Sequence, residues 1–202
     1  KKHIDRVIKD NPNLKDLHIS WFGGEPMLYY DHVVKPIVSY SMKRTQEEGI
    51  EFSSGFTTNG YLIKEHMIPF IKENNIYHFQ ITLDGNRDKH NTVRYTANKK
   101  GTYDEIIDKI KLLVKNQIAT TVRVNYTKET LEKIEELIPE FKDLTEKDRT
   151  HIRFSFHNVW QDGDPNRDKL EEVITNFRRH DFMTNSLYSS FNTVRDSCYA
   201  DK

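Results

Sequence analysis

The chain has 202 residues, with 31 Lys and Arg against 31 Asp and Glu, so its formal net charge at pH 7 is zero. This length fits one domain or slightly more, and 36% hydrophobic residues suffice for one core. The neutral balance gives no electrostatic signal for nucleic acid or for an anionic membrane, so neither partner is expected. The sequence has no run of 18 apolar residues and no signal-peptide pattern.

Cys198 is the only cysteine of the chain. One thiol excludes an internal disulfide and any three- or four-cysteine metal site made by this chain alone. It favours a reducing compartment, so we expect a cytoplasmic location. The chain begins with Lys1 rather than Met, and we expect it to be a piece or a processed product of a longer protein.

Strand-like and helical patterns alternate along the chain. Strand-like runs begin near Leu17, Glu51, Tyr77, Ala119 and His151. Apolar residues at helical spacing predict helices at 3–8, 67–71, 106–114, 131–141 and 170–177. Thr102, with Glu105 three residues later, predicts a capping box at the start of one of them. The alternation predicts an α/β fold of parallel strands joined by right-handed crossovers.

The expected strands are apolar on one face and polar on the other. In the run 77–84 the polar face carries His78, Gln80, Thr82 and Asp84, and the runs 121–127 and 152–157 alternate in the same way. Helices are expected on the apolar face, and the polar face must meet water, a ligand or polar partners. A curved sheet of this kind suits a partial barrel that holds a large polar cofactor. A solvent-facing antiparallel sheet is the alternative, against which the intervening helices argue.

The sequence Trp-Phe-Gly-Gly-Glu-Pro at 21–26 ends the first expected strand. In α/β barrels, ligands bind at the carboxyl ends of the strands. Gly23 and Gly24 let the backbone approach a ligand closely, and Pro26 fixes the exit of the chain. The carbonyls and the Glu25 carboxylate are acceptors, which suit an ammonium group. An ordinary strand-to-helix turn is the alternative.

Polar residues also end the next strands. The sequence Thr-Thr-Asn-Gly at 57–60 is interpreted first as a structural turn, with Thr58 or Asn59 facing a site as the alternative. Asn125 ends the fourth strand and is expected at the same edge as Gly24, Asn59 and Asp84.

After the third strand, Thr82 offers a hydroxyl for a ribose, and Arg94 offers a guanidinium fork for a carboxylate. Asp84 is interpreted as a turn or cap acceptor, and an exposed ion pair is the alternative for Arg94. His157 is expected on the polar face, where a structural role is favoured over contact with a substrate. The chain lacks the motifs of a P-loop, a dinucleotide fold or a serine hydrolase, so a hydrolase or isomerase has no nucleophile–base pair here.

The motifs at 22–26, 58–60 and 82–85, in this order at successive strand ends, resemble the radical S-adenosylmethionine (radical SAM) superfamily. The similarity is greatest to peptide and protein maturases with a SPASM extension, such as anaerobic sulfatase-maturing enzymes. It covers residues 17–94 by motif and extends to about 159 by element order. It implies a partial (β/α)6 TIM-like barrel that here lacks its first strand, with the core at 1–180 and a linker and the start of a SPASM-like extension at 181–202.

The resemblance also implies a cofactor site. SAM would be bound by Gly23, Gly24, Glu25, Pro26, Asn59, Thr82, Arg94 and Asn125. Among these, the turn at 23–26 would hold the methionine amino group, Thr82 the ribose and Arg94 the carboxylate. The family motif Cys-x-x-x-Cys-x-x-Cys, which binds a 4Fe-4S cluster, is absent from this sequence. Cys198 resembles the first cysteine of a SPASM extension, a ligand of an auxiliary cluster only in a longer protein.

The full-length protein would then cleave SAM reductively to a 5′-deoxyadenosyl radical and abstract hydrogen from a peptide or protein side chain. Flavodoxin or ferredoxin is the expected reducing partner, and the 202 residues alone are expected to be inactive and to bind no cluster. A non-catalytic α/β module that binds SAM or another protein is the alternative. A cluster motif upstream of Lys1 would discriminate between the two.

Overall fold

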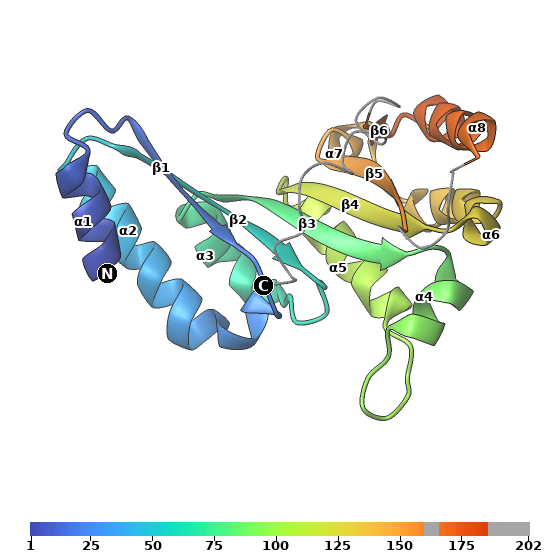
Figure 1. Ribbon diagram of the computed structural model, residues 1–202, viewed down its shortest axis with the longest axis horizontal. Helices are drawn as coiled ribbons and strands as arrows, with labels where there is room; N and C mark the ends of the chain where they lie inside the picture. Colours follow the sequence, from blue (N-terminus) through green and yellow to red (C-terminus); the bar gives the residue numbers. More distant parts are fainter. Residues whose placement is uncertain (160–165, 186–202) are drawn as a thin grey trace.

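The computed structural model describes residues 1–159 and 166–185, and in them six strands form one sheet (Figure 1). The strands are β1 (Asp16–Trp21), β2 (Glu51–Thr58), β3 (Ile76–Asp84), β4 (Ala119–Tyr126), β5 (Ile152–Asn158) and β6 (Met183–Thr184). Each strand pairs with the next in sequence, and every pair is parallel. The parallel α/β fold is therefore confirmed, and the antiparallel alternative is wrong. The sequence pattern missed the short β6, which follows the expected core boundary at 180.

Helices connect the strands. The α-helices are α1 (Lys2–Asp10), α2 (Lys35–Glu47), α3 (Ile68–Glu73), α4 (Arg87–Val93), α5 (Tyr103–Lys115), α6 (Lys128–Leu131), α7 (Glu146–Arg149) and α8 (Arg167–Arg179). Shorter 3-10 or π turns are η1 (Pro26–Tyr29), η2 (Tyr30–Val34), η3 (Glu65–Met67) and η4 (Ile134–Phe141). None of the helices in the described ranges has both the length and the apolarity needed to span a membrane.

The sequential strand order places the connecting helices on one face of the sheet. Right-handed crossovers that all advance in the same direction turn toward the same side. In Figure 1, α1, α2, α3 and α5 lie below the strands. Along β3 and β4, buried residues alternate with half-buried ones, as expected for a sheet covered on one face. The other, polar face is the concave face of the partial barrel.

The core lies between the helices and the apolar face of the sheet. Phe79, Ile81 and Leu83 of β3 are each 0% exposed, as the alternation predicted. At the other end, the ring of Phe177 in α8 lies 4.8 Å from that of Phe154 and 5.1 Å from that of Phe156, measured between centroids. These contacts fix the last long helix to β5 and complete a continuous core.

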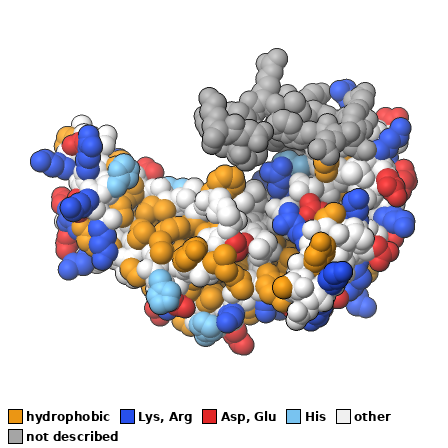
Figure 2. Space-filling view, turned by 60° about the horizontal axis from the view of Figure 1, so that its bottom comes forward, with side chains coloured by type: hydrophobic (Ala, Val, Ile, Leu, Met, Phe, Trp, Pro, Cys, Tyr) orange, Lys and Arg blue, Asp and Glu red, His pale blue; other side chains and the backbone are white. Residues whose placement is uncertain are grey.

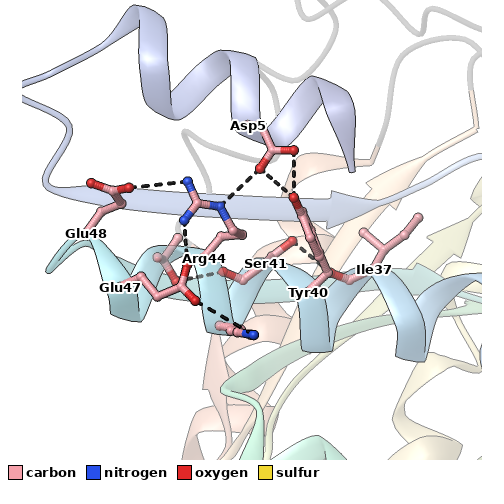
Figure 3. A network of polar contacts seen from close by, with 9 residues as sticks. Asp5, Ile37, Tyr40, Ser41, Arg44, Glu47 and Glu48 are labelled. Carbon is pink, nitrogen blue, oxygen red and sulfur yellow. Dashed lines mark hydrogen bonds and ion pairs between the residues drawn. The ribbon is translucent and has the colours of Figure 1, made fainter.

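A polar network joins α1 to α2 (Figure 3). The Asp5 carboxylate accepts hydrogen bonds from the Tyr40 hydroxyl at 2.5 and 2.6 Å and from Arg44 Nε at 3.1 Å. Arg44 also pairs with Glu47 and Glu48 on its own helix. Only Ile4 and Ile8 of α1 are buried, so these polar contacts supplement a small apolar contact area.

Two local predictions need correction. The helical pattern at 131–141 does not form one α-helix. The helix α6 ends at Leu131, and the rest of the pattern forms the 3-10 helix η4, which contains Pro139. The capping box at Thr102 is wrong, because the Thr102 side chain does not cap α5. Its hydroxyl instead donates to the Arg94 carbonyl at 3.3 Å and lies 3.2 Å from His90 Nε2, while Glu105 pairs with Lys100.

Candidate functional site

The turn after β1 exposes two glycines at the carboxyl edge of the sheet. Gly23 has φ +89° and Gly24 has φ +56°, which L side chains rarely adopt. A Cβ atom on either residue would meet nothing within 4 Å, so the space around the turn is open. Neither carbonyl accepts a hydrogen bond from the described residues. The turn therefore presents unused backbone acceptors.

Glu25 connects this turn to the end of β2. Its Oε1 accepts hydrogen bonds from the Met27 amide at 3.0 Å and the Thr58 hydroxyl at 2.6 Å. Its Oε2 accepts one from the Asn59 amide at 2.8 Å. Both carboxylate oxygens thus have internal partners, and Pro26 occupies the first turn of η1, where a missing amide proton costs nothing. The carboxylate holds the first two strand ends together.

The turn after β2 is structural, as expected. Asn59 Oδ1 accepts a hydrogen bond from the Tyr61 amide at 2.9 Å, which is an Asx turn. Gly60 has φ +79°, and a Cβ atom there would lie 3.0 Å from Ile81 Cγ2. Thr58 is buried beside Glu25, whereas Asn59 lines a cavity of about 540 Å³ that Arg94 also lines.

At the ends of β3 and β4, Asp84 is the centre of a chain of polar contacts. It forms an ion pair with Arg94 Nε and accepts a hydrogen bond from Asn125 Nδ2 at 2.8 Å. Asn125 Oδ1 in turn accepts one from Arg123 Nε at 3.1 Å. Burial raises the pKa of Asp84, but the hydrogen bonds from Arg94 and Asn125 and the Arg94 charge outweigh it, so the pKa lies below its ordinary value.

These contacts correct the interpretation of Asp84 as a turn or cap acceptor. The cap of α4 is Asn86, whose Oδ1 accepts a hydrogen bond from the Lys89 amide at 3.3 Å. Asp84 at the end of β3 instead contacts Arg94, which follows α4, and Asn125 of β4. Gly24, Asn59, Asp84 and Asn125 follow or end parallel strands, so they gather at one edge of the sheet, as predicted.

Sequence patterns did not indicate the role of His90. This residue is 0% exposed, and its Nδ1 accepts a hydrogen bond from the Asp84 amide at 3.2 Å. Since Nδ1 accepts, Nε2 carries the proton and donates toward Thr102 Oγ1. Burial lowers the pKa of His90 to about 4, the Asp84 charge opposes this, and the Arg94 charge adds to it. The one sequence signal for the contact between His90 and the Asp84 amide was a histidine six residues after the end of the strand.

Two predicted ligand groups are unpartnered in the described ranges. The half-buried Thr82 hydroxyl, on the concave face, has no hydrogen-bond partner there. Arg94 uses only Nε for Asp84, so its terminal nitrogens lack partners within the same residues. Both groups are therefore available at the carboxyl edge.

His157 already has a partner on the concave face. Its Nε2 lies 2.8 Å from the Ser155 hydroxyl. Burial, and then the positive charge of Arg123, lowers the pKa of His157 to about 4, so the ring is neutral at pH 7. This agrees with the structural role that the sequence favoured.

The described part of the chain contains no group of three or more His, Cys, Asp or Glu that could hold a metal ion. Cys198 lies outside the described residues. A 4Fe-4S cluster needs three or four thiolates, and the sequence contains one. The residues present therefore do not fit a cluster.

Exposed hydrophobic side chains flank the glycine turn. Phe22 is 71% exposed, Leu28 64% and Tyr29 62%. Figure 2 shows hydrophobic side chains gathered in the left and middle of the face it views, with Lys and Arg at both ends and also right of the middle. Such patches mark contact sites on many proteins.

The structure is that of an α/β protein with a partial barrel of parallel strands, which has open acceptors, a hydroxyl and a guanidinium at its carboxyl edge. The model of the radical SAM superfamily matches residues 1–140. The chain belongs to this superfamily.

Curated relatives and solved structures are also similar to this chain. A cysteine-type anaerobic sulfatase-maturating enzyme of Clostridium novyi is 31% identical over 120 residues, which are 59% of this chain and 32% of that protein. A hexahistidine-tagged anSMEcpe with bound AdoMet has a TM-score of 0.64 at 18% identity, over 88% of this chain and 50% of that one. Streptococcus suis SuiB bound to the precursor peptide SuiA has a TM-score of 0.55 at 20% identity, over 96% and 43%. The two structures show the fold alone, and the chain spans about a third of the length of the curated relatives it matches.

Proposed function

We propose that this chain is the SAM-positioning core of a peptide or protein maturase. The observation that carries the proposal is the carboxyl edge, where the Gly23 and Gly24 carbonyls, the Thr82 hydroxyl and the Arg94 terminal nitrogens have no partners in the described residues. When bound and reduced by one electron, SAM supplies methionine and a 5′-deoxyadenosyl radical, which takes a hydrogen atom from the substrate.

The residues of this chain bind and orient the cofactor. The turn at Gly23–Pro26 accepts hydrogen bonds from the methionine amino group, Thr82 bonds the ribose, and Arg94 binds the carboxylate. Glu25 acts through its three internal hydrogen bonds, which fix the glycine turn against Asn59. Asn125 acts in the same way, because it holds the Asp84 carboxylate to which Arg94 is paired.

Cluster binding and turnover belong to a longer protein in this proposal. The cluster thiolates must come from outside the 202 residues, since the sequence contains one cysteine. Cys198 is then a ligand of an auxiliary cluster, flavodoxin or ferredoxin supplies the electron, and the location is the cytoplasm. The sulfatase-maturating relative and the peptide-bound SuiB structure support a peptide or protein substrate.

Calorimetric titration of the 202-residue chain with SAM tests the binding roles. Thr82→Val should weaken SAM binding roughly twofold to tenfold without lowering the melting temperature, because its hydroxyl has no internal partner. Arg94→Ala should weaken it roughly tenfold to a hundredfold. Thr175→Val, a half-buried threonine on α8, is the control and should bind SAM like the wild type. Wild-type affinity in both edge variants would refute the assigned roles.

The alternative is a module that binds SAM or a partner without catalysis. The observation in its favour is the single cysteine. It is tested in the full-length protein after anaerobic cluster reconstitution and reduction. Release of 5′-deoxyadenosine supports the enzyme, whereas SAM binding without release supports the module.

A further inference from the structure

The concave face carries a second group of polar side chains, near the amino-terminal ends of the strands. His18 Nδ1 lies 2.9 Å from Ser53 Oγ, and His78 Nε2 lies 2.9 Å from Thr121 Oγ1. Thr121 is opposite Arg153 in the register of β4 and β5. These five residues form a row across the sheet from β1 to β5.

A cavity of about 360 Å³ opens at the β3–β5 end of this row. It is lined by His78, Thr121, Thr150, His151, Arg153 and Met183. Arg153 is exposed and has no ion-pair or hydrogen-bond partner within residues 1–159 and 166–185. The Arg153 guanidinium is the donor in this cavity that suits a carboxylate, because the His78 and Thr121 side chains bond each other and the Thr150 hydroxyl donates to the Lys147 carbonyl.

Arg153 and its neighbours place positive charge beside His78. Burial, and then the positive charges of His18 and Arg153, lowers the pKa of His78. Arg123 adds a further positive charge on this face, at the position opposite Ser155.

Three of the acidic groups on this part of the protein are paired or distant, and Asp148 is neither. Asp84 is paired with Arg94. Asp148 lies in α7, just before β5, and its charge acts on His151 of the cavity, while hydrogen bonds from Thr145 chiefly hold its pKa below the ordinary value. Asp16 and Glu51 begin β1 and β2, away from the cavity. Arg153 therefore lines the cavity as a cation without an ion-pair partner in the described ranges, and Asp148 lies near His151.

The distance from this cavity to the carboxyl edge sets the spacing in a peptide that would reach both. Thr121 and Asn125 are four residues apart on β4, a rise of about 13 Å. An extended peptide on the concave face covers the same distance with about four residues. We propose that the cavity binds the carboxylate of an acidic residue about four positions from the residue presented at the carboxyl edge. The presence of a peptide rests on the proposed function, and recognition of its carboxylate rests on Arg153.

The test is a titration of the 202-residue chain at low salt, followed by amide and imidazole NMR shifts. The probes are the pentapeptide Gly-Gly-Glu-Gly-Gly with blocked ends, its Gln counterpart and inorganic phosphate. The Glu peptide should bind roughly threefold to fivefold more tightly than the Gln peptide. Arg153→Gln should abolish this preference. Arg179→Gln removes an exposed charge from α8 and should preserve it.

Phosphate separates a free anion from a carboxylate on a peptide. Displacement of the Glu peptide by phosphate, with no effect on the Gln peptide, supports the proposal. Equal binding of the two peptides, a preference that survives Arg153→Gln, or phosphate binding without peptide binding would overturn it. The titration needs no SAM, cluster or reductant, so its failure is distinguishable from failure of SAM binding at the edge.

Discussion

Asp84 and Arg94 form an ion pair that ties the loop after α4 to the end of β3, and Asn125 of β4 bonds the second oxygen of the same carboxylate at 2.8 Å. The Asp84 side chain is 21% exposed and that of Arg94 is 36% exposed, so solvent only partly screens the pair. One carboxylate thus orients an arginine whose terminal nitrogens remain available for a ligand.

Asp84→Asn should lower the free energy of unfolding by about 1–2 kcal/mol at pH 7, because it removes charge-assisted hydrogen bonds that are partly screened by solvent. The pKa of Asp84 is lowered by folding, so its contribution is present above the unfolded pKa, near 3.9, and is lost as the pH falls through the folded value. Urea denaturation at pH 7 and pH 3 measures both effects.

Asp88→Asn is the matched control, since Asp88 is exposed in the first turn of α4. This substitution should lower the free energy of unfolding by only about 0.3 kcal/mol, because it removes a charge that interacts favourably with the helix dipole. Equal losses in the two variants would mean that the ion pair adds nothing beyond a surface charge.

His90 should make the protein less stable in mild acid. Its pKa is about 4 in the folded state and near 6.5 when unfolded, so the unfolded state takes up more protons between these values. The contribution is complete above pH 6.5 and is lost as the pH falls toward 4. Between pH 7 and pH 5 the loss should be about 1–2 kcal/mol.

Denaturation of His90→Asn at both pH values tests this assignment. The Asn side chain offers an acceptor to the Asp84 amide but does not titrate, so the variant should be less stable overall and should lose less stability between pH 7 and pH 5. A pH dependence identical to that of the wild type would show that other groups cause it.

Gly24→Ala and Gly60→Ala should differ, although both residues have positive φ. At Gly60 the added Cβ would lie 3.0 Å from Ile81, so strain and crowding together should cost about 1–3 kcal/mol. At Gly24 the space is open, so the cost should be about 1 kcal/mol, but the methyl group enters the proposed SAM site. Thermal melts with and without SAM separate these effects. SAM binding that is unchanged in Gly24→Ala would exclude close approach of the cofactor to that turn.

Asp5→Asn should loosen α1. The hydrogen bond from Tyr40 and then the contacts with Arg44 outweigh burial and lower the pKa of Asp5, so its ionised form is the one that holds the helix to α2. Amide hydrogen exchange in residues 2–10 should become severalfold faster, with no change in β3. Asp10→Asn, which breaks only the exposed pair with Arg6, should leave the exchange nearly unchanged. Equal exchange in both variants would contradict a docking role for the Asp5 network.

The sequence was sufficient to predict the strand positions and their polar and apolar faces, because a period of two in runs such as 77–84 has few interpretations. The sequence pattern did not predict α2. The buried side of this helix includes Ser41 and Thr45, so it does not show the apolar stripe that marks a helix. Their hydroxyls bond carbonyls of the preceding turn, Ile37 and Ser41, which makes polar residues acceptable in a buried position. The two-residue β6 is too short for any periodicity.

For the candidate site, the sequence placed the right residues at one edge but not their mutual contacts. Asp84 and Asn125 are 41 residues apart, and Glu25 is 33 residues from Thr58. Such pairings depend on the register of neighbouring strands, which no local pattern encodes. Local signals predicted the turns at Gly24 and Gly60, where the required backbone conformation is a property of one residue.

The sequential order of the strands has a consequence for biosynthesis. Because every strand pairs with its predecessor in sequence, each new β-α unit that leaves the ribosome finds its pairing edge already formed. No strand has to wait for a partner that is synthesised much later, so the sheet can grow stepwise from β1 to β6. Within the described sheet, each newly added strand covers the edge of its predecessor, which shortens the time for which those backbone groups are exposed to other chains.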